Sequence, residues 1–290
     1  MNYRDRAGKE YKVSTSQDRF LRFLYTNRFG KRLLKFMISD KLTRLIEWYM
    51  NTRISTLKID PFIKKNNIKI SDYEKKFYYS YNDFFTRKIK KSKRPVNSDP
   101  NVLVSPSDGK VTVYPISDKL IVNIKNIDYS VKSLLLDREL SEELEGGWLY
   151  VIRLTVDNYH RYCYVDSGEK SRNAFIPGVL HTVRPVALER EPVFIENCRE
   201  YCLIKTECFG TIVQMEVGAM LVGKIKNELR EAGEVVRGEE KGHFEYGGST
   251  IIVLLKKGKA ELLPEIIENS SEGVETPVKM GEKIGERYGR

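Results

Sequence analysis

Residues 242–255 read Gly242-His-Phe-Glu-Tyr-Gly-Gly-Ser-Thr-Ile-Ile-Val-Leu-Leu255, in which two glycines and a serine open an apolar run. Aliphatic and β-branched residues bounded by glycine are typical of a buried β-strand. A Gly-Gly turn into such a strand is one interpretation of the segment. The other interpretation is that the segment is reactive. Glycines at 247 and 248 permit unusual φ and ψ angles and leave the peptide bond before Ser249 unobstructed. The Ser249 hydroxyl is then placed to attack its own preceding carbonyl.

Runs of the same kind predict a β-rich body that begins near residue 102. Each is rich in β-branched residues and bounded by glycine, proline, aspartate or serine, as strands are; the runs span residues 102–116, 119–124, 148–154, 211–217 and 249–255. Residues 17–56 instead repeat apolar side chains at helical spacing. Residues 57–95 predict one short helix and a basic loop that ends near Pro95. The predicted fold class is α+β, with a helical basic region over residues 1–100 and a sandwich or barrel-like body over residues 101–290.

A short internal repeat predicts paired turns in the C-terminal part. Val236-Arg-Gly-Glu-Glu-Lys-Gly242 resembles Lys279-Met-Gly-Glu-Lys-Ile-Gly285, which begins 43 residues later. Each copy places two glycines four residues apart among charged residues. We expect each glycine at a bend that needs positive φ, which suits a symmetric sandwich or barrel. The repeat covers only seven residues, so coincidence is the alternative.

Charge is distributed unevenly along the chain. The net charge is +10, but residues 1–100 carry 25 basic and 10 acidic side chains, whereas residues 101–290 carry 25 and 30. A basic surface of this kind meets polyanions, either nucleic acid or anionic lipid. Within residues 17–56 the cations are interleaved with aromatic residues, which fits a membrane interface or an ordinary helix with a solvated basic face. No nucleic-acid recognition motif accompanies the charge, so nucleic acid is not an expected partner.

Composition excludes several other classes of protein. Hydrophobic residues make up 41% and aromatic residues 11%, enough for a large core, so the chain is not disordered. No stretch of about 18 uncharged apolar residues occurs, so no bilayer-spanning helix is expected. The first residues lack an apolar signal region, so secretion is not expected. The four cysteines, at 163, 198, 202 and 208, have no paired CxxC spacing, so neither a disulfide framework nor a metal site is predicted.

Histidine is scarce, which limits the choice of a catalytic imidazole to residues 160, 181 and 243. His160 follows the strand-like residues 148–154 and is either a surface residue at a strand end or part of a site. Asp108, in Ser105-Pro-Ser-Asp-Gly109, is either a turn-former or a carboxylate that orients an imidazole.

Five motifs occur in order along the chain and lead to a sixth at Ser249. The five are Tyr81-Asn-Asp-Phe-Phe-Thr-Arg-Lys88, Val104-Ser-Pro-Ser-Asp-Gly109, Tyr159-His-Arg161, Val213-Gln-Met-Glu-Val-Gly-Ala219 and Gly238-Glu-Glu-Lys-Gly242. In this order they resemble the motifs of the phosphatidylserine decarboxylases, a family of pyruvoyl-dependent lipid enzymes. Gly247-Gly-Ser-Thr250 resembles that family's self-processing site. The resemblance extends from about residue 80 to residue 255.

The resemblance implies that a precursor cleaves itself between Gly248 and Ser249. Ser249, His160 and Asp108 would form a Ser–His–Asp arrangement that activates the hydroxyl. The products would be residues 1–248 and residues 249–290, and Ser249 would become a pyruvoyl group, the covalent cofactor. That ketone would condense with the substrate amine and accept the electrons released as carbon dioxide leaves. His160 is the candidate acid that then protonates the α-carbon.

One position departs from the family's Tyr-His-x-x-His pattern, because Cys163 stands where the second histidine is expected. In the family that histidine belongs to self-cleavage and the first to decarboxylation. Three interpretations stay open: His160 performs both tasks, Cys163 is a weaker proton acceptor, or processing is impaired. The unperturbed thiol pKa of about 8.5 favours the first. His181 is a candidate pocket residue, and His243, six residues before Ser249, is a candidate to approach the site.

The predicted function is pyruvoyl-dependent decarboxylation of phosphatidylserine to phosphatidylethanolamine in phospholipid biosynthesis. The predicted partners are an anionic phospholipid substrate and a membrane surface, and a homodimer of the processed chains is left open. The predicted location is peripheral, on the cytoplasmic side of the cell membrane. Two alternatives are kept: a pyruvoyl decarboxylase of a soluble amino acid, and a non-catalytic lipid-binding protein with the same fold.

Overall fold

The computed structural model describes residues 2–12, 16–37, 39–124, 127–179, 181–183, 185–189, 191–219, 224–246 and 249–289. The helices are α1 (Ser16–Thr26), α2 (Arg28–Met37), α3 (Asp40–Met50), α4 (Ile59–Asn66), α5 (Tyr81–Phe85), α6 (Val131–Leu135), α7 (Arg138–Glu142), α8 (Pro185–Leu188), α9 (Val193–Glu196) and α10 (Pro264–Ser271), with 3₁₀ helices η1 (Arg53–Lys58), η2 (Ile70–Asp72) and η3 (Lys91–Lys93). The strands are β1 (Asn2–Arg4), β2 (Glu10–Lys12), β3 (Val102–Val104), β4 (Gly109–Pro115), β5 (Ile121–Ile124), β6 (Ile127–Ser130), β7 (Trp148–Leu154), β8 (Arg161–Cys163), β9 (Gly168–Lys170), β10 (Ala174–Ile176), β11 (Arg199–Thr206), β12 (Gly210–Gly218), β13 (Ile225–Asn227), β14 (Gly233–Val235), β15 (Glu240–Phe244), β16 (Ser249–Leu255), β17 (Ala260–Leu262), β18 (Thr276–Val278) and β19 (Lys283–Arg287). The predicted α+β class is confirmed, although no sheet in the described part of the chain closes into a barrel.

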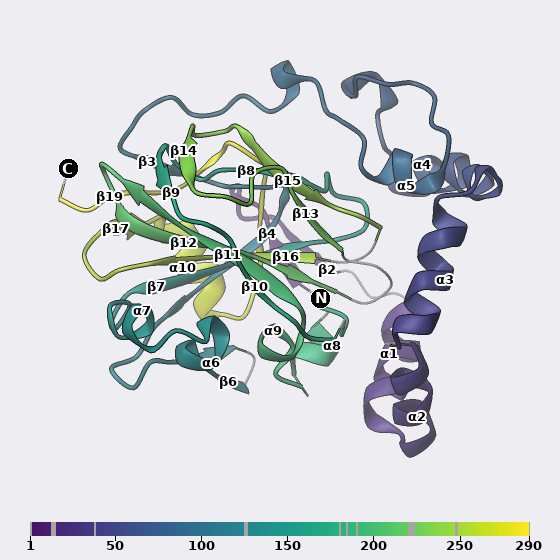
Figure 1. Ribbon diagram of the computed structural model, residues 1–290, viewed down its shortest axis with the longest axis horizontal. Helices are drawn as coiled ribbons and strands as arrows, with labels where there is room; N and C mark the ends of the chain where they lie inside the picture. The colour runs from purple at the N-terminus through teal and green to yellow at the C-terminus, as the bar shows by residue number, and fades with distance from the viewer. Residues whose placement is uncertain are drawn as a thin grey trace.

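A nine-stranded antiparallel sheet forms the centre of the body, with strands in the order β14-β9-β11-β12-β16-β7-β4-β18 and β10 paired to β11 (Figure 1). Side chains alternate along β16, so that Ile252 and Leu254 pack on one face while Ile251 and Val253 pack on the other. Both faces of the sheet are therefore buried. This explains why the predicted strand segments 148–154 and 249–255 are apolar except at Arg153, Ser249 and Thr250, and they form β7 and β16 as expected.

Helices cover one face of the central sheet, and two small sheets cover the other. On the helical face, α1, α6, α8 and α9 contribute Leu24, Leu134, Ala187 and Phe194 to one apolar cluster. On the opposite face, the sheets β13-β15-β8 and β17-β19-β3 contribute Tyr162, Phe244, Leu103 and Ile284 to a second cluster. The body is therefore layered, and the sheet β13-β15-β8 lies against the face toward which Ile251 and Val253 point.

The seven-residue repeat corresponds to two equivalent turns. Gly238 and Gly281 have φ of +79° and +84°, as predicted for a bend. In each turn the glutamate after the glycine bonds back to the residue three positions before it: the Glu239 amide to the Val236 carbonyl, and the Glu282 amide to the Lys279 carbonyl, both at 3.0 Å. The strands that follow, β15 and β19, each pair through a register shift. The interpretation as coincidence is wrong.

The second glycine of each repeat has a different role from the predicted one. Gly242 and Gly285 lie within strands at the register shifts and do not have positive φ. A Cβ on Gly242 would lie 2.1 Å from the Lys226 carbonyl oxygen, and one on Gly285 would lie 3.0 Å from the Tyr150 hydroxyl. These glycines are needed for the close approach of neighbouring chain segments, which periodicity in one sequence does not reveal.

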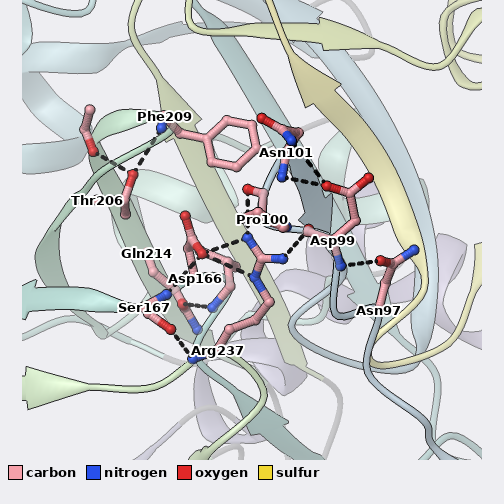
Figure 2. Close-up of polar contacts among 12 residues, drawn as sticks. Asn97, Asp99, Pro100, Asn101, Asp166, Ser167, Thr206, Phe209, Gln214 and Arg237 are labelled. Carbon is pink, nitrogen blue, oxygen red and sulfur yellow. Dashed lines mark hydrogen bonds and ion pairs between the residues drawn. The ribbon is translucent and has the colours of Figure 1, made fainter. Parts of the chain in front are cut away.

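Arg237 joins one of these turns to two other segments (Figure 2). Its guanidinium donates to the Asp166 carboxylate at 2.7 and 3.0 Å, to the Pro100 carbonyl at 3.0 Å and to the Asp99 carbonyl. The Arg237 amide donates to the Ser167 hydroxyl at 2.9 Å. Because a guanidinium offers five donors in a rigid fork, one side chain fixes the chain before β3, the turn before β9 and the turn before β15.

The N-terminal region is helical, as predicted, but it contains more helices than expected and an additional β-hairpin. Residues 17–56 form α1, α2, α3 and part of η1, and Figure 1 shows these helices along one side of the body. Residues 57–95 contain two helices, α4 and α5, where one was expected. The first residues form an unpredicted hairpin, β1-β2, whose Tyr3 bridges to Glu275 of the body. None of the helices in the described ranges has the length and apolarity needed to cross a bilayer.

A buried ion pair connects the central sheet to the small sheet. Glu216 on β12 and Lys241 on β15 are both fully buried and bonded to each other. Asn227 on β13 contacts both, accepting from the lysine and donating to the carboxylate at 3.2 and 3.3 Å. Burial of two charges is tolerated here because each has a charged partner and a further hydrogen bond.

Replacing one member of this pair is expected to lower the free energy of unfolding far more than replacing both. Glu216→Leu leaves the Lys241 charge buried without its partner and should lower the free energy of unfolding by about 3–5 kcal/mol. The double variant Glu216→Leu/Lys241→Met has no buried charge at either position and should lie within about 2 kcal/mol of wild type. Urea titrations of the three proteins measure both values, and a single variant as stable as wild type would contradict this description of the pair.

Candidate active site

Four neighbouring strands bring the predicted serine and aspartate to one edge of the central sheet. Ser249 is the first residue of β16 and pairs with Gly218 at the end of β12 and with Leu154 at the end of β7. Lys110 of β4 pairs with Arg153 of β7, so Asp108 immediately precedes the start of β4 beside Leu154. Adjacent strands lie about 4.8 Å apart, so the Asp108 backbone is about two strand spacings from that of Ser249.

His160 reaches the same edge through two short connections. The turn 155–159 leads from the end of β7, beside Ser249, to His160 at the start of β8. The His160 carbonyl accepts a 2.9 Å bond from the amide of Phe244, and only residues 245–248 separate Phe244 from Ser249. Ser249 has the same orientation on β16 as Ile251 and Val253, which point toward the sheet that contains β8. The structure therefore brings His160 and Ser249 to one place.

The His160 ring is completely buried and held on two sides. Its Nδ1 lies 2.9 Å from the Asn158 carbonyl oxygen, and the Phe85 ring packs against it with centroids 4.0 Å apart. A carbonyl only accepts hydrogen bonds, so Nδ1 carries the proton in the neutral ring and Nε2 keeps its lone pair. Phe85 was not singled out from the sequence, although it lies in the motif 81–88.

Asp108 is held by Arg94 rather than by an imidazole. The Arg94 guanidinium donates to both carboxylate oxygens, at 2.7 and 2.5 Å, and the Met280 amide donates at 3.0 Å. Both side chains are largely buried. Arg94 was missed in the sequence because it ends a Lys-rich run before Pro95, where one more cation carries no signal. The expected carboxylate–imidazole contact is thus replaced by a carboxylate–guanidinium pair, and the Asn158 carbonyl orients His160.

Cys163 lies beside the Asp108 loop, where it is buried and weakly acidic. Its amide donates to the Pro106 carbonyl at 2.8 Å, which ties β8 to the loop that contains Asp108. Burial, with the Asp108 charge as a smaller cause, raises the pKa of the Cys163 thiol to about 12. A thiol with this pKa stays protonated near neutral pH, so the geometry favours His160 over Cys163 as the proton acceptor.

Three buried hydroxyls at this edge accept or donate no hydrogen bond within the described residues: those of Ser107, Ser249 and Thr250. Buried polar atoms are nearly always bonded, and exceptions often mark reactive groups. The Ser249 hydroxyl is therefore not held away from a neighbouring carbonyl by another partner. Gly247 and Gly248, including the predicted cleavage position, lie outside the described residues.

The side-chain amide of Asn197 donates to the carbonyls of Gly218, which pairs with Ser249, and of His181, at 2.7 and 2.8 Å. His181 is thus close to this edge, and its role as a pocket residue stays a prediction. His181 lies ahead of α8, where its Nδ1 is 3.1 Å from the Tyr25 hydroxyl of α1 and its Nε2 is 3.3 Å from the Glu196 carboxylate. Burial lowers the pKa of His181, and Glu196 partly opposes that shift. The contact connects α1 to the segment before β11, so His181 supports the N-terminal helices against the body.

His243 points toward a group of charged residues at the outer side of β15. Its Nδ1 lies 4.0 Å from the Glu228 carboxylate, and ligand atoms of Glu228, Glu240 and His243 lie within 4.8 Å of one another. Burial, followed by the charges of Arg161, Lys226 and Lys88, lowers the pKa of His243 to about 4. Arg161 bonds to Glu240, and Lys88 lies 3.8 Å from it. The positive charges of Arg161 and Lys88 disfavour the binding of a divalent metal ion between Glu228, Glu240 and His243.

Comparisons with known proteins agree with this geometry. The family model described as phosphatidylserine decarboxylase matches residues 81–286. The chain is 47% identical over 267 residues to phosphatidylserine decarboxylase proenzyme 2 of Clostridium acetobutylicum, covering 92% of this chain and 91% of that protein. It is 36% identical to a phosphatidylserine decarboxylase proenzyme of Clostridium botulinum and 35% identical to one of Desulfitobacterium hafniense, each over 99% of both chains. These relatives are named as proenzymes, a class of protein that is made as a precursor and then processed. Within that class, the chain belongs to the phosphatidylserine decarboxylase family.

Replacing the Cys163 thiol should leave self-processing nearly unchanged. The thiol with pKa of about 12 is not a useful base at pH 7.5, so Cys163→Ala should cleave before Ser249 at a rate within about threefold of wild type. The rate is measured from the conversion of full-length chain to fragments on denaturing gels. Cys202→Ala is the matched control, since this thiol is also buried but lies in the middle of β11, opposite Gln214 of β12. A hundredfold loss in Cys163→Ala alone would assign the thiol a direct role.

Proposed function

We propose that this chain is a proenzyme that cleaves itself between Gly248 and Ser249 and then decarboxylates phosphatidylserine to phosphatidylethanolamine. The activity follows the family membership and the names of the relatives. The observation that carries the proposal for this chain is the meeting of Ser249 and His160 at one sheet edge, with the Ser249 hydroxyl buried and free of hydrogen bonds among the described residues.

In the proposed cleavage, the Ser249 oxygen attacks the Gly248 carbonyl carbon, and its proton passes to Nε2 of His160. The amide bond becomes an ester when the Ser249 nitrogen leaves and takes up a proton. Loss of the α-proton of Ser249 expels the residue 248 carboxylate, and water then replaces nitrogen as ammonia, so that residue 249 ends as a pyruvoyl group. His160 is suited to the proton transfers because the Asn158 carbonyl fixes its tautomer.

The surroundings of Ser249 fit a small ketone at the same position. The residue is fully buried, its neighbours across the sheet are Gly218 and Leu154, and no described side chain donates to its hydroxyl. A pyruvoyl group supplies an electron-accepting carbonyl for decarboxylation of an amino acid substrate. Backbone pairing of β16 with β12 and β7 would hold the group, and His160 would deliver a proton to the substrate α-carbon.

The role proposed for Asp108 is electrostatic support of the site rather than direct orientation of His160. Arg94 neutralises and positions the carboxylate, and the Met280 amide fixes it to the turn at Gly281. The pair holds the loop 105–108 against β8 through the Pro106–Cys163 bond. Asp108 therefore fixes the position of the loop 105–108, which also contains Ser107, beside the candidate site.

Intact mass spectrometry of freshly purified protein tests the proposal directly. Wild type should give two chains, residues 1–248 and residues 249–290, with the mass of the smaller chain reporting the pyruvoyl group. Ser249→Ala should stay a single chain because it lacks the attacking oxygen. His160→Gln should cleave at least about 100-fold more slowly, which is the usual contribution of a general acid–base.

His243→Gln is the matched control for His160→Gln, because it removes an imidazole on the neighbouring strand that faces Glu228. It should cleave like wild type. An uncleaved wild-type chain of full mass would contradict the proposed function and favour the non-catalytic alternative. Cleaved protein that decarboxylates a free amino acid and leaves phosphatidylserine unchanged would favour the soluble-substrate alternative.

We also propose that the N-terminal helices dock the protein peripherally on an anionic membrane, on the cytoplasmic side. The support is a surface that is both aromatic and basic: Phe29 and Phe36 of α2 are 74% and 61% exposed, and Arg28, Arg32 and Lys35 of the same helix are exposed as well. None of these three cations forms an ion pair with a described residue. Apolar side chains can enter the acyl boundary while the cations meet lipid headgroups.

Reversing three charges on α2 should weaken binding to anionic vesicles. Arg28→Glu/Arg32→Glu/Lys35→Glu removes three cations that each contribute about 1 kcal/mol near an anionic surface, so binding should fall at least about tenfold. Co-sedimentation with phosphatidylglycerol vesicles measures this, and added salt should reduce wild-type binding. Lys119→Glu/Arg172→Glu/Lys257→Glu makes the same charge change on the exposed body. Equal losses in both triple variants would contradict a specific role for α2.

A further inference from the structure

A second exposed apolar surface lies in the N-terminal region, beyond α2 and α3. It is formed by η1 and by residues 76–79, and its four most exposed apolar side chains are Ile54 at 66%, Leu57 at 78%, Phe77 at 89% and Tyr79 at 72%. We call these four residues the apolar tip. Leaving a Phe side chain almost wholly in water is unfavourable by more than about 1 kcal/mol relative to burying it. Four large apolar side chains exposed together therefore suggest a surface that is covered by a binding partner.

The local structure holds the four side chains outward. Residues i and i+3 share a face in a 3₁₀ helix, so Ile54 and Leu57 project together from η1. In residues 77–79 the side chains alternate: Tyr78 turns inward, with its hydroxyl bonded to the Lys75 carbonyl at 2.8 Å and its ring against Phe84, while its two neighbours stay exposed. The Ser55 hydroxyl accepts a 2.8 Å bond from the Tyr81 amide and joins the two segments.

Between the two segments lies an open apolar groove of about 530 Å³. Its walls include Leu57, Ile59, Pro61, Ile63, Ile70 and Phe77. The surrounding charge is mainly basic: Arg53, Lys58 and Lys76 are exposed and form no ion pair with a described residue, against one exposed carboxylate in the lining, that of Asp60. An apolar centre with a cationic rim complements a lipid monolayer with anionic headgroups, and it opposes a partner with a basic surface.

The apolar tip is also connected to the candidate active site. Tyr78 packs on Phe84, Phe84 on Tyr81, Tyr81 on Tyr246, Tyr246 on Phe85, and Phe85 on His160, with ring centroids between 4.0 and 5.8 Å apart at each contact. These rings form one packed wall from the tip to the imidazole. A membrane that meets the tip is therefore held on the same structural unit as His160, and not only on the more distant α1 and α2.

We propose that the apolar tip inserts into an anionic lipid monolayer and that the groove beside it receives a lipid acyl chain. The substrate lipid is identified by the proposed function, on which this inference rests, but the insertion itself needs no catalysis. Leu57 and Phe77 are the inserted anchors, and Arg53, Lys58 and Lys76 meet the headgroups. The surface lies at the opposite end of α3 from α2, so the protein contacts the bilayer at two places (Figure 1).

The test compares Leu57→Ser/Phe77→Ser with the control Phe175→Ser/Tyr288→Ser, whose two side chains are each 60% exposed on the body. Three quantities are measured: self-cleavage, co-sedimentation with phosphatidylglycerol vesicles, and decarboxylation of short-chain soluble and long-chain vesicular phosphatidylserine. The tip variant should cleave fully, bind vesicles at least about tenfold more weakly and lose activity mainly on vesicles. The control should match wild type in all three measurements.

Unchanged vesicle binding by the tip variant, or an equal loss in the control, overturns the inference. Absence of cleavage in wild type contradicts the proposed function instead, because cleavage is intramolecular and needs no membrane. A second measurement avoids removing the anchors and uses a single tryptophan: the fluorescence of Phe77→Trp in a Trp48→Phe/Trp148→Phe background should be quenched by brominated acyl chains in anionic vesicles. A residue at position 77 that stays unquenched while the protein is bound to vesicles also overturns the inference.

Discussion

The pairing of β16 between β12 and β7 is the constraint on which the rest of the structure depends. Seven consecutive residues of β16 pair on each side, and every one of them is buried. A strand in this position cannot shift by one residue without turning its apolar side chains to the wrong faces. Its first residue, Ser249, is consequently fixed at the sheet edge.

The same constraint explains how a cleaved chain can remain one protein. Residues 249–290 supply β16, α10, β17, β18 and β19, which lie in three different parts of the body. β18 pairs with β4, and β19 pairs with β3, in addition to the two neighbours of β16. A break before Ser249 removes none of these pairings. The freed end of the small chain would stay beside His160, which is where a group formed from Ser249 has to remain.

The sequence predicted the elements that depend on local pattern and missed those that depend on contacts between distant segments. Continuous apolar runs identified β7 and β16 because both sheet faces are buried, and the ordered motifs identified Ser249, His160 and Asp108 as the candidate site. The pairing of Asp108 with Arg94 was missed, because a guanidinium in a Lys-rich run looks like any other surface cation. The Phe85–His160 contact joins residues 75 positions apart, and no spacing rule predicts it. Whether Asp108 and His160 have the assigned chemical roles stays a prediction.

The net positive charge of the chain lies in residues 1–100, and this basic region is attached to the β-rich body at defined contacts. Two buried contacts and one surface ion pair attach it to the body. Tyr25 of α1 bonds to His181, and α5 packs its rings against Tyr246 and His160, while Lys224 pairs with Glu47 of α3 at 3.1 Å on the surface. The exposed cations of α2 and those around the apolar tip take no part in these contacts. A flexible basic tail would bind anionic lipid equally well, but it would not fix the distance between the lipid surface and Ser249. If the protein docks as proposed, a substrate whose reactive amine lies at the membrane surface would require that distance to be set, and the packed aromatic wall between the tip and His160 would set it.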